Sequence, residues 1–314
     1  MAQKAILREL ENRNIKVSQL DGADVYLAGD RKRPLFFSGS FTNAVPYNLG
    51  IIFSNKYYVS QILSFNKVPV APGRVFGQYD KLEALSFARK LGFPVILRLE
   101  QAKSKVRGEK INRAKDFTEA FNKLSQAREG ILVERYKGGE SHRMFITGNG
   151  YYNVLKKQLP FIAGDGKSTV RDLIDKENLK RINSFDNYLQ PLNITIQILQ
   201  KYNLDFKMIL AKKKRIIFSD LVSEKDGAIF EDITPTLHPS VIKLGQSVLK
   251  AFPGLGYLGF EIIAKNCGQR LTKGNCVVSE IYVSPGPNIR FLLHKKGKPE
   301  RKAEEVIVDL LLEE

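Results

Sequence analysis

Two β-prone runs late in the chain, each carrying a carboxylate, limit the fold more than any other feature of the sequence. The first is Gly259-Phe-Glu261-Ile-Ile, and the second is Glu280-Ile-Tyr282-Val-Ser-Pro285-Gly286. The segment between them ends in Gly274-Asn275, which is typical of the turn of a hairpin. We therefore expect the runs to form adjacent strands, with Glu261 and Glu280 on neighbouring strands.

Side chains alternate between the two faces of a strand. The second acid should therefore share its face with Val278, Tyr282 and Ser284, while Ile281 and Val283 take the other face. Magnesium prefers one or two protein carboxylates together with phosphate oxygens and water, which two facing acids can supply. Two solvated strand acids would show the same spacing, so the spacing alone leaves both interpretations open.

The composition is that of a globular protein. The chain has 314 residues, a length that is enough for two or three packed subdomains. Of these residues 43% are hydrophobic, and the mean hydropathy is -0.23, as in a soluble globular protein. The first residues predict a short charged amphipathic helix, not a secretion signal. Cys267 and Cys276 do not make a disulfide framework, so we expect reduced thiols in a cytoplasmic protein without membrane association.

The net charge of +17 favours a polyanionic or phosphorylated partner. Nucleic acid, nucleotide and acidic peptide all satisfy this charge. The sequence shows no helix-turn-helix, zinc-finger or RNP-type aromatic motif, so nucleic acid is not expected. With three histidines and no close Cys/His spacing, a structural zinc site is not expected either.

Hydrophobic periodicity predicts an α+β chain. Residues 17–50 alternate short apolar runs with turns, which indicates a small β-rich segment. Two α+β subdomains meeting near Tyr136 are the simplest organisation, with a largely antiparallel second half. We expect helices over 56–65, 79–91, 115–126, 170–174, 189–201, 241–252 and 301–312, and strands at 95–99, 131–136, 144–146 and 151–155.

The run Gly164-Asp-Gly-Lys167-Ser168-Thr169 ends like a Walker A loop. That loop needs a glycine five residues before its Gly-Lys pair, and position 161 is Phe. We therefore exclude a P-loop and predict a turn that feeds a helix, with Ser168 or Thr169 as the cap and Asp172 near the positive helix end.

Read together, several segments resemble the ATP-grasp ligases, in particular the branch that contains cyanophycin synthetase and bifunctional glutathione synthetase. The most specific segment, residues 156–174, is similar to the branch signature of two basic residues, a proline and GDGxSTxxxLI. Residues 232–239, Asp-Ile-Thr-Pro-Thr-Leu-His-Pro, are similar to its DVTxxxHP run. The resemblance extends over roughly residues 24 to 300.

The resemblance implies an ATP-grasp fold, in which two α+β subdomains enclose a nucleotide cleft behind a short β-rich N-terminal segment. We expect the boundaries 1–55, 56–135 and 136–314. It also implies that ATP and Mg²⁺ activate a carboxylate as an acyl phosphate, which an amine then attacks. Phosphoryl transfer is catalysed mainly by positioning and charge neutralisation, so the site should contain cations, metal and a cover loop.

The resemblance assigns residues to each part of such a site. Lys56 and Arg98 would bind phosphates, residues 134–137 the adenine, Arg143 the transferred phosphate, and Glu261 and Glu280 the metal. Arg290 would hold a substrate carboxylate or be a surface arginine. The full set matched to nucleotide-binding positions is Lys56, Arg98, Lys103, Lys105, Glu134, Arg135, Tyr136, Lys137, Glu140, Ser141 and Lys156.

Three positions and one loop depart from the family pattern. Arg98 stands where relatives have a lysine, and Tyr282 stands where they have a metal-binding asparagine. Ser141 stands where they have a ribose-binding acid, and Glu140 lies beside Ser141 in this chain. The loop 101–108 keeps one glycine where relatives have several, so its cations either replace backbone amides at the phosphates or form a solvated basic hairpin.

The leading hypothesis is a carboxylate-amine ligase that forms ADP and acts on an acidic amino acid or peptide, which suits the positive net charge. The alternative is a catalytically weakened ATP-grasp protein that binds nucleotide or another polyanion without ligation. The sequence leaves a homo-oligomer and a partner protein both open.

Overall fold

The computed structural model describes residues 2–20, 25–29, 34–38, 41–42, 46–101, 108–182, 191–218, 228–282 and 303–313. These residues form two compact units. In its described part, the first unit holds residues up to 154 together with 233–282 and 303–313, and the second holds residues 155–232. No helix in the described residues is long and apolar enough to cross a membrane.

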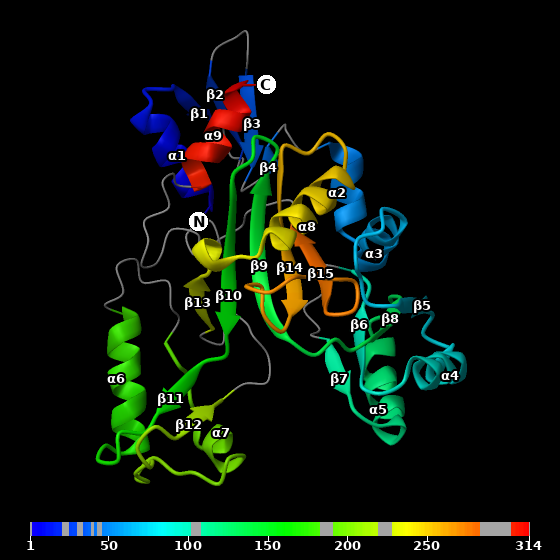
Figure 1. The fold of residues 1–314 in the computed structure, drawn as a ribbon, viewed down its shortest axis with the longest axis vertical. Helices are drawn as coiled ribbons and strands as arrows, with labels where there is room; N and C mark the ends of the chain where they lie inside the picture. The colour runs from blue at the N-terminus through cyan, green and yellow to red at the C-terminus, as the bar shows by residue number, and fades with distance from the viewer. Residues whose placement is uncertain are drawn as a thin grey trace. The chain divides into compact units, whose positions relative to one another are not determined.

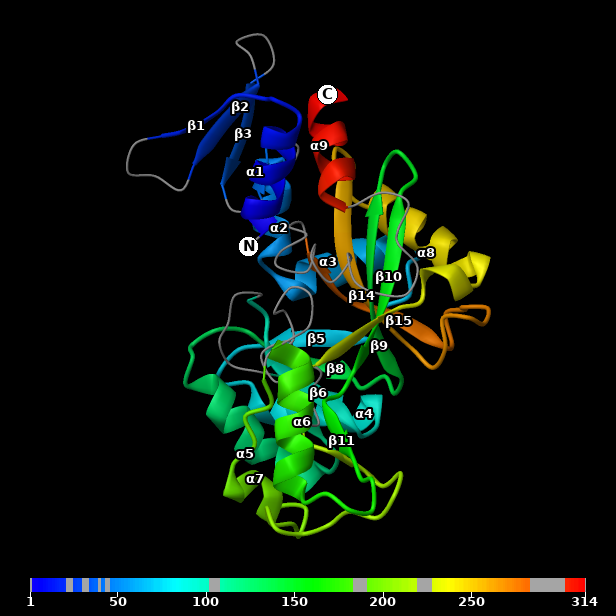
Figure 2. The ribbon, with the colours of Figure 1, turned by 90° about the vertical axis from the view of Figure 1, so that its left-hand side faces the viewer.

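The first helix of the chain packs against a helix near the end of the chain, and a small β-sheet follows the first helix. Helix α1 (Ala2–Asn12) precedes an antiparallel sheet of β1 (Val17–Gln19), β2 (Tyr26–Gly29), β3 (Pro34–Ser38) and β4 (Phe41–Thr42) (Figure 2). Helix α9 (Ala303–Glu313) lies beside α1 (Figure 1). Arg13 joins them by donating hydrogen bonds to Asp309 at 2.5 Å and to the Glu305 carbonyl at 3.2 Å. The helices predicted at both ends are confirmed.

Helices α2 (Tyr47–Phe53) and α3 (Lys56–Phe65) follow, and α3 has the predicted bounds. Asn55 fixes the start of α3, because its side chain accepts hydrogen bonds from the backbone N–H groups of Tyr57 and Tyr58. Val59 and Leu63 then face the core from successive turns. Lys56 is therefore held at the first turn of a capped helix.

A four-stranded antiparallel sheet comes next, in the order β5 (Gly73–Phe76), β8 (Ile131–Arg135), β6 (Val95–Leu99) and β7 (Glu109–Ile111). Helices α4 (Lys81–Leu91) and α5 (Ala114–Ser125) pack against it and share its apolar core. The elements predicted for this stretch are confirmed to within two residues.

The second large sheet has the strand order β13 (Ile229–Asp232), β10 (Tyr152–Gln158), β9 (Glu140–Thr147), β14 (Tyr257–Ala264) and β15 (Cys276–Tyr282). After a 3-10 turn, η2 (Thr234–Thr236), helix α8 (Pro239–Lys250) crosses one face (Figure 1). Leu244 and Val248 of α8 pack on Phe260 and Ile262 of β14 in the largest cluster of apolar residues described.

The predicted hairpin is confirmed, and Glu261 of β14 lies directly opposite Glu280 of β15. Its connection is the longer loop 265–275, so Gly274-Asn275 is only the end of that loop and not a two-residue turn. The predicted face of Val278 is wrong. The register shifts between Glu261 and Ile262, so Val278 joins Ile281 on the core side while Glu280 points away.

The second unit contains β11 (Phe161–Ala163) paired with β12 (Arg215–Ile217), and helices α6 (Val170–Ile182) and α7 (Ile196–Gln200). Thr169 and Asp172 cap α6 reciprocally, as the predicted turn requires. Helix α7 is shorter than predicted. Asn178 hydrogen-bonds both backbone groups of Leu192, and Thr195 caps α7, so residues 191–195 are held outside the helix.

Candidate functional site

Three charged side chains form a row across β9, β14 and β15, which are strands of the second large sheet that lie in the first unit. Arg143 of β9 lies opposite Glu261 of β14, which in turn lies opposite Glu280 of β15. Cross-strand partners at one register project from the same face, so the three side chains gather on the face turned away from α8. The two predicted acids and the predicted arginine are therefore brought together.

Glu261 is almost completely enclosed, with 3% of the residue exposed. Its Oε1 accepts a hydrogen bond from Arg143 Nε at 2.8 Å, and its Oε2 accepts one from Ser141 Oγ at 2.7 Å. The Tyr282 hydroxyl lies 3.4 Å from Oε1, and its ring stacks under the Arg143 guanidinium at 4.7 Å. Both oxygens of this carboxylate thus face donors of the protein.

Glu280 is the more accessible acid, with 33% of its side chain exposed against 4% for Glu261. Arg98 Nη1 donates to its Oε1 at 3.2 Å, and Lys56 Nζ lies 3.6 Å from the same oxygen. The Tyr282 hydroxyl donates to Oε2 at 2.5 Å. Tyr282 therefore bridges the two acids of the row.

Arg98 connects the two large sheets of the first unit. Its Nη2 lies 3.0 Å from Glu134 Oε1 on β8 and donates to the Ser279 carbonyl of β15 at 3.3 Å. The Arg98 Nε is buried and has no hydrogen-bond partner in the described structure. A buried donor without a partner is costly, so an acceptor that reached it would bind favourably.

Burial and neighbouring charges set the protonation of this cluster. Burial lowers the pKa of Lys56 although Glu280 opposes the shift, and burial raises the pKa of Glu134 although Arg98 opposes it. Burial also raises the pKa of Glu280, but Lys56, Arg98 and the Tyr282 hydrogen bond outweigh it, so the net shift is downward. Burial first, and then both acids, hold the pKa of Tyr282 well above its usual value, so the phenol is a neutral donor.

A small cavity of about 120 Å³ opens beside this cluster and is lined by Lys56, Ser279, Glu280 and Tyr282 together with Phe53, Val59 and Ile281. Among the described residues, no group of three or more His, Cys, Asp or Glu side chains is placed to hold a metal ion. Any ion would therefore depend on the two acids of the row and on ligand oxygens.

For the other predicted site residues, the contacts found lie away from the acid row. Arg135 donates to the Leu91 carbonyl, Lys110 covers the Tyr136 ring at 4.1 Å, and Lys137 donates to the Gly274 carbonyl at 2.6 Å. Glu140 begins β9 opposite Ala264. Lys156 lies on β10 in the second unit, opposite Glu231. Lys103, Lys105 and Arg290 lie outside the described residues.

Sequence reasoning missed Asn55. Besides capping α3, its amide donates to Glu100 Oε2 at 3.0 Å, while the Lys56 N–H donates to the Glu100 carbonyl at 2.8 Å. Asn before a predicted helix is a cap signal, so the sequence contained it. The bulge that turns Val278 toward the core had no such signal.

Comparison with known proteins identifies proteins that this chain resembles. No protein-family model matches the chain. It is 27% identical over 252 residues to cyanophycin synthetase of Geminocystis herdmanii, which covers 76% of this chain and 28% of the relative. The chain thus spans less than a third of that relative's length.

Solved structures of ligases share the fold. The bifunctional glutathione synthetase from Pasteurella multocida superposes with a TM-score of 0.72 at 18% identity, over 99% of this chain and 43% of that chain. The ATP-grasp ligase PsnB, solved with a minimal precursor, superposes with a TM-score of 0.50 at 14% identity, over 85% of this chain and 61% of that one.

Proposed function

We propose that this protein, whose fold is that of the ATP-grasp ligases and whose sequence resembles the branch containing cyanophycin synthetase, is an ATP- and magnesium-dependent carboxylate-amine ligase. It would phosphorylate a carboxylate and join the resulting acyl phosphate to an amine, releasing ADP and phosphate. The observation that carries the proposal is the cluster in which Lys56, Arg98 and Arg143 alternate with Glu134, Glu280 and Glu261.

Lys56 and Arg98 are the proposed phosphate-binding cations. In the ligand-free protein, Glu280 and Glu134 neutralise them, which keeps both cations oriented inside a largely buried site. A nucleotide phosphate would replace part of this pairing and offer the Arg98 Nε the acceptor that it lacks. Such preorganised cations stabilise charge that develops during phosphoryl transfer.

The acids fit one magnesium ion better than two. Glu280 is accessible and ionised, and once phosphate engages Lys56 and Arg98 its carboxylate is available as a hard oxygen ligand. Glu261 already receives Ser141, Arg143 and Tyr282, so it would support the site mainly by orienting those groups. When bound beside Glu280, the ion would neutralise phosphate charge.

We also propose that the substrate is acidic, because the chain's net charge of +17 attracts free carboxylates. Cys267 and Cys276 are not joined by a disulfide, and reduced cysteines are typical of the cytoplasmic location that we propose. A homo-oligomer and a partner protein both stay open. Residues 134–137 stay the proposed contact with adenine.

Calorimetric titration with a nonhydrolysable ATP analogue, with and without magnesium, tests the nucleotide site. We expect magnesium-dependent binding of roughly micromolar affinity, or about 8 kcal/mol. ADP release would then be measured with acidic amino acids and peptides. Glu280→Gln should reduce release about 100-fold or more, because it removes the charge that orients both cations and metal. Absence of analogue binding to the folded protein would contradict the proposal.

One observation favours the second candidate, an ATP-grasp protein that binds nucleotide or another polyanion without ligation. The Tyr282 phenol occupies the space between the two acids, where a ligase with two metal ions needs ligands. Analogue binding without ADP release on any acidic substrate would select this candidate.

A further inference from the structure

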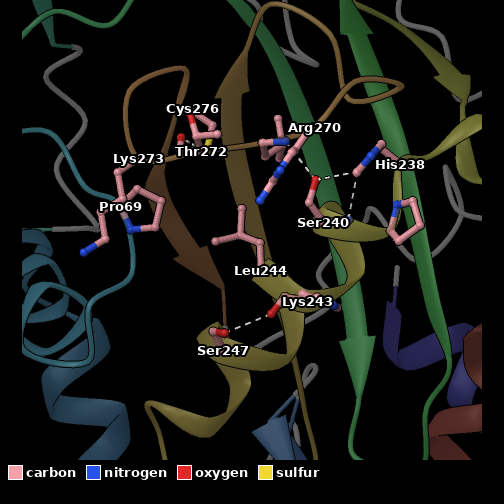
Figure 3. Close-up of a pocket in the computed structure, with 12 residues that line it drawn as sticks. Pro69, His238, Ser240, Lys243, Leu244, Ser247, Arg270, Thr272, Lys273 and Cys276 are labelled. Carbon is pink, nitrogen blue, oxygen red and sulfur yellow. Dashed lines mark hydrogen bonds between the residues drawn. The ribbon is translucent and has the colours of Figure 1, made fainter.

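A second pocket lies away from the acid row, on the other side of the sheet. It has a volume of about 540 Å³ and opens between the first turns of α8, the loop 265–275 and Pro69 (Figure 3). Leu244 of α8 belongs both to its lining and to the apolar core under the sheet. Since Glu261 and Glu280 project from the opposite face, this pocket is separate from the acid row.

The lining combines three cationic side chains with apolar and small polar ones. Lys243, Arg270 and Lys273 supply the cations, and no Asp or Glu is among the twelve lining residues. None of these three side chains makes an ion pair or hydrogen bond with a described residue, unlike the paired Lys56, Arg98 and Arg143. The rest of the lining is Pro69, His238, Pro239, Ser240, Leu244, Ser247, Leu271, Thr272 and Cys276.

Hydrogen bonds hold the walls of the pocket in place. The Leu271 N–H donates to Ser240 Oγ at 2.8 Å, and the His238 N–H donates to the Cys267 carbonyl at 3.0 Å. His238 Nδ1 accepts from the Ser240 N–H at 3.1 Å, which ties the ring to the first turn of α8. The loop that carries Arg270 is therefore tied to the start of α8 before any ligand arrives.

We propose that this pocket binds a small organic anion with two or more negative charges on an apolar body, carried as carboxylate or phosphate groups. Three like charges around one hollow repel each other, and a multivalent anion would relieve that repulsion. Arginine and lysine bind carboxylate and phosphate by charge-assisted hydrogen bonds. The volume is within the range of about 300–1,000 Å³ typical of small-molecule sites.

Calorimetric titration of the full chain with citrate and, separately, with phenyl phosphate tests the proposal at 150 mM salt. We expect saturable one-site binding of at least one probe, and the preferred probe tells a carboxylate ligand from a phosphate ligand. The double variant Lys243→Gln, Arg270→Gln should weaken it tenfold or more. The matched control Lys250→Gln, Lys265→Gln removes the same charge from the same helix and loop but from residues outside the pocket, and should change affinity less than twofold.

Three outcomes would overturn the proposal. The first is that neither probe shows saturable binding. The second is that both double variants weaken binding equally, which would indicate attraction by the general positive charge of the surface. The third is that Lys56→Ala abolishes binding, which would place the anion at the nucleotide site. All substituted pocket and control residues except Lys56 are exposed, so unfolding temperatures should stay unchanged and report that the variants are folded. Because the pocket and the acid row are separate, neither result depends on ligase activity.

Discussion

At the scale of single residues, Arg98 explains how three strands and one helix can share a charged centre. Its planar guanidinium reaches Glu280 through Nη1 and both Glu134 and the Ser279 carbonyl through Nη2, whereas a lysine would present one compact ammonium. With the Arg98 and Glu134 side chains 12% and 14% exposed, neither charge is well solvated if the other is lost. The arginine at this position therefore supports the contact between the two sheets as well as the charge balance of the cluster.

Replacing Arg98 by Met should destabilise the fold by about 3 kcal/mol, because it leaves Glu134 and Glu280 without their shared cation. Adding Glu134→Gln to Arg98→Met should restore part of that loss, since fewer uncompensated charges remain. Urea unfolding of both single variants and the double variant measures this coupling. Strictly additive losses would mean that the two side chains do not depend on each other.

Tyr282 should control the number of metal ions. We expect the wild-type protein with an ATP analogue to bind one Mn²⁺, and Tyr282→Asn to bind two, because the amide oxygen replaces the phenol between the acids. Tyr282→Phe is the control, since it removes the hydroxyl but keeps the ring that fills the space. Electron paramagnetic resonance of free Mn²⁺ counts the ions without requiring turnover. One ion in Tyr282→Asn would disprove this role.

At the scale of elements, one glycine sets the start of the strand that carries Ser141 and Arg143. Gly139 has φ +152°, and a Cβ placed on it would lie 2.9 Å from the backbone carbon of Ala264. Residue 140 pairs with Ala264 in the ladder, so a side chain here would push β9 away from β14. The closeness of these strands is what brings Ser141 within reach of Glu261.

Gly139→Ala should lower the free energy of unfolding by about 3 kcal/mol, from backbone strain and the contact with Ala264. Gly150→Ala provides the comparison, since Gly150 has φ +93° but no atom within 4 Å of the added Cβ. That control should cost only about 1–2 kcal/mol. Urea denaturation of both variants separates strain from the steric contact. Equal losses would show that the approach to Ala264 does not matter.

Elements with strong local signals were predictable from sequence, and long-range geometry was not. Helix α3 was predicted at its observed bounds because its apolar residues recur at helical spacing, although the capping role of Asn55 was missed. The α+β ATP-grasp fold and the β14–β15 hairpin are likewise confirmed. The bulge beside Glu280 and the shortened α7 depend on contacts that are distant in sequence, namely strand register and the hold of Asn178 on Leu192.

At the scale of the whole molecule, the net charge of +17 affects every anion that approaches, so charge alone cannot identify a ligand. The described structure separates two kinds of cation. Lys56, Arg98 and Arg143 are paired and largely buried, whereas Lys243, Arg270 and Lys273 are unpaired around an open pocket. Salt screens exposed charges far more than buried ones. The affinity of a ligand bound by the exposed cations should therefore fall more steeply with salt than that of a ligand bound by the buried ones.

Raising salt from 50 to 200 mM should therefore weaken binding of the magnesium-ATP analogue less than tenfold, since its contacts lie in the buried cluster. A single-stranded oligonucleotide held by the exposed surface should lose affinity much more steeply, by about 10³ if six or more phosphates are neutralised. Titrating both ligands at the two salt concentrations compares the slopes within one protein. If the analogue showed the steep slope and ignored magnesium, the protein would bind polyanions through its surface, and the acid row would serve the stability of the fold.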